Sequence, residues 1–163
     1  MRIVPFKPRH AEGFAVLNRA WLGRYDLWET PGADELSNPH RIAESGGRIY
    51  VAERRTSVVG TSAVVCGEPG GMDIRWLAVD PDWQRLGIGR RLLTRCARYA
   101  RRNGAERLVV HTSSRLTEAL RLYRHFGFVD RPMPRDRSSA VADVYMELVL
   151  QAAADEQVSV THA

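Results

Sequence analysis

The sequence predicts a mixed α/β fold, in which strands and helices alternate within a single domain. The chain has 163 residues, which is enough to bury one proper hydrophobic core. Stretches with the period of two typical of strands are interleaved with stretches that have helical spacing. A strand–helix–strand unit in the second half should place two strands parallel, whereas the hairpins before it should be antiparallel.

In the first half we expect a strand, two helices and three further strands, over residues 2–6, 8–21, 34–44, 48–54, 58–66 and 72–79. Apolar residues at Phe14, Leu17 and Trp21 have the spacing of one helix face. Pro31-Gly32 breaks the chain between the two helices, and Pro39 interrupts the second. The turn before the last of these strands contains Pro69 followed by two glycines.

The second half begins with a strongly amphipathic helix from Ile88 to about Arg102, which ends at Asn103-Gly104. A strand over 107–112, a helix over 116–127 and a closing strand over 142–150 follow. The predicted order is β-α-α-β-β-β-α-β-α-β-β. Residues 1–150 form the predicted domain, and the polar segment 151–163 is expected to be a disordered tail.

Composition excludes several classes of function. The five histidines and the cysteines Cys66 and Cys96 show no metal-ligand spacing, so no metal is expected. The chain has no apolar run long enough to cross a bilayer, and its first seven residues lack the apolar core of a signal peptide, so a cytoplasmic location is expected. The net charge of +5 favours anionic ligands, including a phosphorylated cofactor or nucleic acid.

The segment after the strand at 72–79 has the pattern of a phosphate-binding turn. A polar turn leads to two glycines that open the arginine-rich helix. The first amides of a helix lack intrahelical acceptors and lie at its positive end, so they suit a phosphate or diphosphate. The dinucleotide fingerprint is excluded because Leu92 stands where its third glycine should be, and a Walker A loop is excluded because no lysine follows Gly89.

Three blocks in this order resemble the GNAT superfamily of CoA-dependent N-acyltransferases. The residues Gln84, Arg85, Leu86, Gly87, Ile88 and Gly89 resemble its Q/R-x-x-G-x-G/A signature. The strand Trp76–Pro81 resembles its splayed strand, and Ala119–Phe128 resembles its A-x-x-L-Y-x-x-x-G-F segment. The resemblance implies a single GNAT-like domain, with a central, mostly antiparallel mixed sheet and helices on both faces.

The resemblance also implies acetyl-CoA as co-substrate, without a metal. The amides between Gln84 and Arg90 would hold the CoA diphosphate, and the backbone of Leu77, Ala78 and Val79 would pair with the pantetheine arm. Many family members have an asparagine seven residues before the tyrosine of the third block, where this chain has Leu116. Ser113 or Ser114 would then replace that contact.

Acetyl transfer to an amine requires one proton to be removed and another to be supplied. The resemblance implies Tyr123 as the general acid that protonates the departing thiolate. Asp73 is the first candidate for the base, because it lies six positions before Val79 and a period of two puts both on one face. Its carboxylate would act through water and needs desolvation to become basic enough. His111 is the other candidate, since its ordinary pKa lies nearer neutrality.

The acceptor is expected to be a small-molecule or peptide amine. The connection between the first two helices would wall its pocket, with Tyr25, Trp28 and Glu29 as binding residues and Trp21 as a packing residue. Two other functions stay open: a CoA-binding regulatory domain without catalysis, and a basic nucleic-acid-binding module. The nineteen acidic residues and the lack of a zinc-finger or RNP motif make nucleic acid the less favoured partner. A homodimer is compatible with the resemblance.

Overall fold

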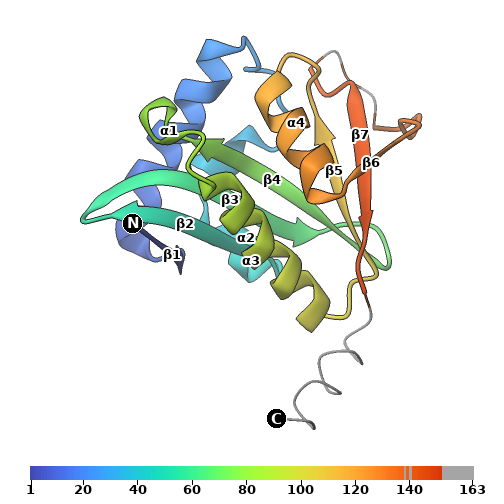
Figure 1. Ribbon diagram of the computed structural model, residues 1–163, viewed down its shortest axis with the longest axis horizontal. Helices are drawn as coiled ribbons and strands as arrows, with labels where there is room; N and C mark the ends of the chain where they lie inside the picture. Colours follow the sequence, from blue (N-terminus) through green and yellow to red (C-terminus); the bar gives the residue numbers. More distant parts are fainter. Residues whose placement is uncertain (138, 140, 152–163) are drawn as a thin grey trace, which may run out of the picture.

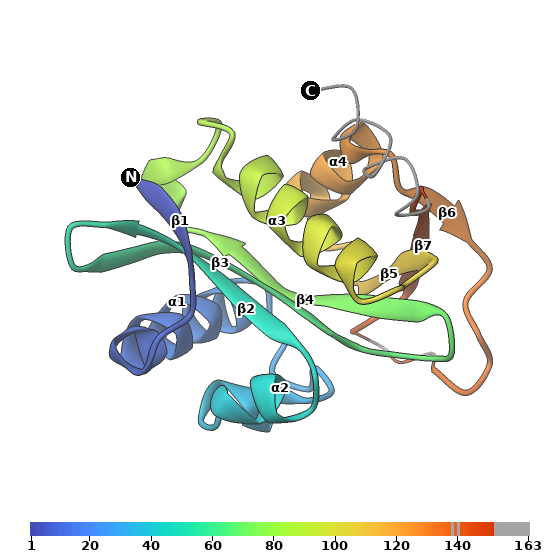
Figure 2. The same cartoon turned by 90° about the horizontal axis from the view of Figure 1, so that it is seen from below.

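The computed structural model describes residues 1–137, 139 and 141–151 and shows one open sheet with helices on both faces (Figures 1 and 2). Seven strands are arranged in the order β1-β2-β3-β4-β5-β7-β6. The predicted mixed α/β fold is therefore confirmed. The predicted tail lies outside the described residues, apart from its first residue, Gln151.

The strands are β1 (Arg2–Pro5), β2 (Arg48–Arg54), β3 (Ser57–Cys66), β4 (Gly71–Val79), β5 (Arg107–Thr112), β6 (Val129–Arg131) and β7 (Val144–Val149). The α-helices are α1 (Ala11–Arg24), α2 (His40–Glu44), α3 (Ile88–Arg102) and α4 (Thr117–Phe126). Short 3-10 turns occupy Pro8–His10, Ala33–Leu36 and Pro81–Trp83. In the part of the chain that the structure describes, no helix is both long and apolar enough to span a membrane.

The second predicted helix is much shorter than expected. Residues 34–44 contain the 3-10 turn Ala33–Leu36 and the single helix α2, which begins after Pro39. Proline lacks the amide that a continuous helix would need, so it stands at the start of α2. The segment between α1 and α2 is therefore mostly loop, and this loop borders the site described below.

Two apolar cores lie on opposite faces of the sheet. Figure 2 shows the helices that cover them, with α3 and α4 on one face and α1 and α2 on the other. On one face, α3 and α4 pack against β-strand residues that include Ile74 and Val110. On the other face, α1 and α2 pack against residues that include Val51 and Ala63. Because residues along a regular strand alternate between faces, β1 to β4 supply side chains to both cores, whereas β5 and β7 supply only the core under α3 and α4.

One pair of strands, β4 and β5, is parallel, with α3 as the crossover between them. The pairing joins Gly71–Ile74 to Arg107–Val110 and then stops. Beyond Ile74, β4 keeps β3 as its partner on one edge, while the described residues place no strand on its other edge. The sheet therefore opens between β4 and β5.

A β-bulge in β4 coincides with this opening. Arg75 pairs with Ala63 and Ala78 pairs with Thr61, so two residues of β4, Trp76 and Leu77, stand opposite one residue of β3. Trp76 has a φ of 55°, a left-handed conformation that a tryptophan seldom adopts. A bulge bends the strand and exchanges the faces of the residues after it.

Buried hydrogen bonds hold the bulge in place. The hydroxyl of Thr61 donates to the carbonyl of Trp76 at 2.7 Å and accepts from the side-chain amide of Asn18 at 3.0 Å. The same Asn18 amide also donates to the carbonyl of Phe14 in α1 at 2.9 Å. Both Thr61 and Asn18 are almost fully buried, so their polar atoms depend on these partners.

Replacing Thr61 by valine should lower the free energy of unfolding by about 1–3 kcal/mol, because the carbonyl of Trp76 and the amide of Asn18 lose a buried partner without a change in side-chain size. Urea denaturation followed by circular dichroism measures this loss. Thr56→Val, in the exposed turn between β2 and β3, is the matched control and should stay within about 0.5 kcal/mol of the original protein. Equal midpoints for the two variants would show that these hydrogen bonds do not stabilise the bulge.

Candidate active site

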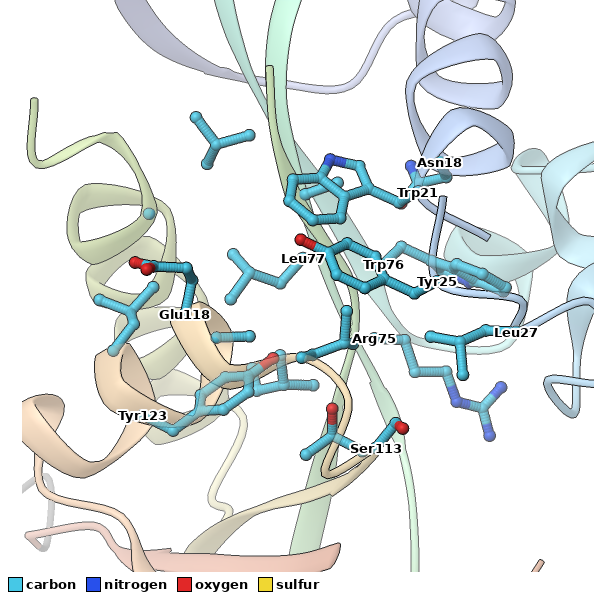
Figure 3. A pocket seen from close by; sticks show the side chains of 18 of the residues that line it. Asn18, Trp21, Tyr25, Leu27, Arg75, Trp76, Leu77, Ser113, Glu118 and Tyr123 are labelled. Atoms are coloured by element: carbon cyan, nitrogen blue, oxygen red, sulfur yellow. The ribbon is translucent and has the colours of Figure 1, made fainter. Parts of the chain in front are cut away.

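A cavity of about 780 Å³ passes through the opening between β4 and β5 and is lined from both faces of the sheet (Figure 3). On the α3/α4 face its walls include the turn before α3 and one side of α4. On the α1/α2 face they include the end of α1 and the loop that follows it. The bulge and the broken β4–β5 pairing thus create a passage between the two faces.

The turn before α3 offers a row of unpaired backbone amides. No amide from Arg85 to Arg90 donates a hydrogen bond to another described residue, whereas the next amide, of Arg91, bonds to the carbonyl of Gly87 at 3.1 Å. These amides lie at the N-terminal end of a fifteen-residue helix, where its dipole is positive. Arg85, Arg90 and Arg121 add positive charge to this part of the cavity wall. The arrangement is suited to an anion such as a diphosphate.

The two glycines of this turn serve different purposes. Gly87 has a φ of 79°, and a Cβ added to it would meet no atom within 4 Å, so its backbone conformation is what excludes other residues. At Gly89, a Cβ would stand 2.6 Å from the side chain of Leu122, so this glycine allows α3 and α4 to pack closely. Gly87 shapes the turn, and Gly89 brings α4 to it.

The second half of β4 presents a free edge beside this turn. Leu77, Ala78 and Val79 all line the cavity, as do Gln84, Arg85, Gly87, Ile88, Gly89 and Arg90. The side-chain amide of Gln84 donates to the carbonyl of Val79 at 3.2 Å and so ties the turn to the strand. Leu86 does not line the cavity and is exposed to solvent.

Tyr123 enters the cavity from α4. Its side chain is 5% exposed, and its ring packs edge-on against Phe128 with the centroids 5.4 Å apart. Burial raises the pKa of the Tyr123 phenol well above its ordinary value, so the hydroxyl stays protonated. In Figure 3 this hydroxyl is turned toward the middle of the cavity.

Asp73 and His111 lie together on the opposite, α1/α2 face of the sheet. Ile74 and Val110 are paired across β4 and β5 and face the α3/α4 core, so their neighbours Asp73 and His111 face the other way. Both line the cavity at the point where the two strands part. The expectation that Asp73 shares a face with Val79 is wrong, because the bulge adds a residue between them and Val79 packs on the α3/α4 side.

Burial changes the proton affinity of both groups. Desolvation raises the pKa of Asp73, although the nearby His111, Arg75 and Arg137 favour its ionised form. Desolvation lowers the pKa of His111, against the opposing effect of Asp73. The imidazole is therefore mostly neutral at pH 7, and its buried Nε2 has no hydrogen-bond partner in the described part of the chain. A carboxylate with increased basicity and a neutral imidazole thus lie at the opening.

The end of α1 supplies an aromatic wall on this face. The rings of Trp21 and Tyr25 are stacked, with centroids 5.0 Å apart and planes within 7°, and both line the cavity. Trp28 and Glu29 do not line it: both are exposed, and Trp28 lies against Gly23 on the outside of the loop. Of the predicted binding aromatics Tyr25 and Trp28, only Tyr25 therefore lines the cavity. Trp21, which was expected to be a packing residue, lines it as well.

The two serines after β5 face different ways. Ser113 is buried and lines the cavity, and its hydroxyl accepts a hydrogen bond from the amide of Arg115. Ser114 is exposed, and both its amide and its hydroxyl donate to the carboxylate of Asp143 at 2.8 and 2.6 Å. Ser113 is therefore the serine available to a ligand.

Several lining residues were not anticipated from the sequence: Asn18, Arg75, Trp76 and Arg137. The run Trp76–Val79 lacks the alternation of a regular strand, and that break was a signal of the bulge that re-aims these side chains. Arg137 belongs to a loop far along the chain and had no comparable signal. Among the described residues, no group of three or more potential metal ligands is found.

Comparisons with known proteins identify the family to which the chain belongs. A family model described as an acetyltransferase (GNAT) domain matches residues 45–130. An IAA acetyltransferase from Azospirillum brasilense is 34% identical over 113 residues, which cover 68% of this chain and 73% of that protein.

Two solved structures share the fold. A GNAT-family acetyltransferase from Staphylococcus aureus Mu50 has a TM-score of 0.81 at 18% identity, covering 92% of this chain and 99% of that one. The putative acetyltransferase yncA from Salmonella typhimurium, solved with its cofactor acetyl-CoA, has a TM-score of 0.72 at 21% identity, covering 93% and 94% of the two chains. Since the family model matches more than half of the sequence, the chain belongs to the GNAT family of acetyltransferases.

Proposed function

We propose that the protein transfers the acetyl group of acetyl-CoA directly to an amine, with the two substrates entering from opposite faces of the sheet. The observation that carries this proposal is the cavity through the β4–β5 opening, which has unpaired amides on one side and Asp73 on the other. The acetyl-CoA bound to the structurally similar Salmonella protein supports the choice of co-substrate.

The α3/α4 face is assigned to acetyl-CoA. The amides of Arg85–Arg90 would bind its diphosphate, and the free edge of Leu77–Val79 would pair with its amide-containing arm as an added strand does. Ser113 adds a buried hydroxyl to the cavity lining, which we assign to a contact with the same arm. This arrangement leads the thioester toward the opening beside Tyr123.

The α1/α2 face is assigned to the amine. An ammonium entering there meets Asp73, whose raised pKa makes it a better proton acceptor than an exposed aspartate. The proton moves to Asp73 through a water molecule, and the neutral imidazole of His111 is the second group able to accept it. The free amine nitrogen then attacks the thioester carbonyl carbon from this side.

Collapse of the resulting tetrahedral intermediate breaks the bond between carbon and sulfur. The phenol of Tyr123 donates its proton to the departing thiolate, and the attacking nitrogen, which is cationic in the intermediate, releases its second proton. That proton restores the Tyr123 phenol, Asp73 returns the first proton to solvent, and the products are the N-acetylated acceptor and free CoA. The high pKa of the buried phenol keeps it protonated at neutral pH, as a general acid requires. The base and the acid thus act from opposite faces of the sheet.

Gly87→Val should weaken acetyl-CoA binding by at least about tenfold, because a β-branched residue cannot hold the left-handed backbone that aims these amides. Isothermal titration with acetyl-CoA measures the Kd. Gly104→Val is a matched control at the other end of α3: Gly104 has the same φ of 79° and equally open surroundings. It should lose similar stability and keep the original Kd. Equal Kd values for both variants would remove the turn from the binding site.

The proposed proton transfers predict two separable kinetic losses. Tyr123→Phe should bind acetyl-CoA normally and lower kcat about a hundredfold, because the thiolate must leave without a proton donor.

Asp73→Asn should lower kcat/KM and abolish its decrease at acidic pH, since that decrease reflects protonation of a carboxylate with a raised pKa. Thiol release followed across pH measures both.

His111→Gln distinguishes the two candidate bases in the same assay. With Asp73 as the base, this variant keeps the decrease of kcat/KM at acidic pH. A profile that loses the decrease in His111→Gln and keeps it in Asp73→Asn would transfer the role of base to His111. An unchanged kcat in Tyr123→Phe would contradict the assignment of the acid.

A further inference from the structure

The amine side of the cavity carries three aromatic side chains. Trp21 and Tyr25 project from the end of α1, and Trp76 comes from the bulge of β4 (Figure 3). Leu27, which is buried in the loop after α1, adds a further apolar wall. A binding surface of this composition stabilises a flat apolar group through burial and ring contacts.

Contacts within the protein hold this aromatic wall in position. The stacked rings of Trp21 and Tyr25 brace each other, and the guanidinium of Arg24 lies 5.6 Å from both ring centroids. The indole nitrogen of Trp76 donates to the carboxylate of Glu35 at 2.7 Å. A surface that is already ordered loses little entropy when a ring binds to it.

The charges near the wall disfavour an acceptor with several positive groups. Asp73 is the buried carboxylate at the inner end, and the guanidiniums of Arg75 and Arg137 also line the cavity. The exposed carboxylate of Asp136 is a further lining group. Arg137 approaches Asp73 at 3.7 Å, and Arg75 is paired with Glu35. An ammonium at Asp73 would have these two guanidiniums as neighbours, and they would repel a second ammonium placed close to the first.

Two hydrogen bonds from Arg115 across the rim of the cavity disfavour an extended polypeptide as the acceptor. The guanidinium of Arg115, in the loop before α4, donates to the backbone carbonyls of Tyr25 and Asp26 at 3.3 and 2.9 Å. It joins the two loops that border the amine side of the cavity. A protein segment passing between these loops would break both hydrogen bonds, whereas a small molecule need not.

We propose that the acceptor is a small primary amine that carries a flat aromatic ring. The ring lies against Trp21, Tyr25 and Trp76, and a short aliphatic linker brings the amine to Asp73. This inference rests on the proposed acetyltransferase function and specifies the substrate class of the same site.

An acceptor panel tests the substrate class. Phenethylamine and tryptamine are compared with hexylamine, which has a similar reach but no ring, and with spermidine and a lysine-containing peptide. We expect kcat/KM for the two aromatic amines to exceed that of hexylamine by about tenfold or more, from the ring contacts and the added burial. Spermidine and the peptide should react more slowly still.

Variants of the wall test its role. Trp21→Ala and Tyr25→Leu should raise the KM for phenethylamine about tenfold, raise the KM for hexylamine clearly less, and leave the Kd for acetyl-CoA unchanged. Trp28→Ala is the control, because Trp28 lies in the same loop, is 58% exposed and does not line the cavity. It should behave as the original protein in all three measurements.

The possible outcomes are distinct. If acetyl-CoA does not bind, or no amine gives thiol release, the proposed function fails and the inference fails with it. If acetyl-CoA binds and hexylamine, spermidine or the peptide reacts as fast as the aromatic amines, the inference alone is overturned.

Phenylalanine and tryptophan are added to the panel as the carboxylated counterparts of phenethylamine and tryptamine. A preference for the aromatic acceptor supports the inference whether the amine or the amino acid reacts faster. If the amino acids have the higher kcat/KM and Arg137→Gln abolishes that difference, the acceptor carboxylate binds at Arg137.

Discussion

The hydrogen bond from the Thr61 hydroxyl to the Trp76 carbonyl is the contact on which the site depends. It stabilises an extra residue in β4 at the place where β4 leaves β5. Asn18 links the same hydroxyl to α1, so the aromatic wall at the end of that helix is positioned by the interaction that opens the sheet. A passage through a sheet requires broken strand pairing, and buried hydrogen bonds compensate for that loss here.

The opening separates two chemical environments that would interfere on a single surface. The α3/α4 face has free amides and arginines suited to an anion, together with a phenol that burial keeps protonated. The α1/α2 face has a carboxylate whose pKa is raised by burial and a predominantly neutral imidazole. Because the sheet lies between them, the groups proposed to remove and to supply protons meet only at the gap.

Local pattern predicted most of the elements and the turn before α3, because these follow from short-range rules; the helix expected over 34–44 is the exception. The apolar stripe of α3, its stop at Gly104 and the conformation required at Gly87 are all encoded within a few residues. The lack of alternation in Trp76–Val79 was a local signal of the bulge, but the hydrogen bonds that stabilise it come from Thr61 and Asn18, which are distant in sequence from Trp76. Missing the bulge led to the wrong shared face for Asp73 and Val79.

The same limit applies to the amine side. The residue order in the loop after α1 did not distinguish Trp21 and Tyr25, which line the cavity, from Trp28 and Glu29, which are exposed. The directions of these side chains depend on where α1 ends and on the hydrogen bonds from the Arg115 guanidinium to the carbonyls of Tyr25 and Asp26. Tertiary contacts of this kind leave no periodic signal in the sequence.

A crystal structure of the acetyl-CoA complex tests the central claim most directly. The account predicts the diphosphate on the amides of Arg85–Arg90, the pantetheine arm along the free edge of Leu77–Val79, and the thioester in the gap between β4 and β5 beside Tyr123. Acetyl-CoA bound on the α1/α2 face, or with its thioester away from the gap, would contradict the division of the site between the two faces.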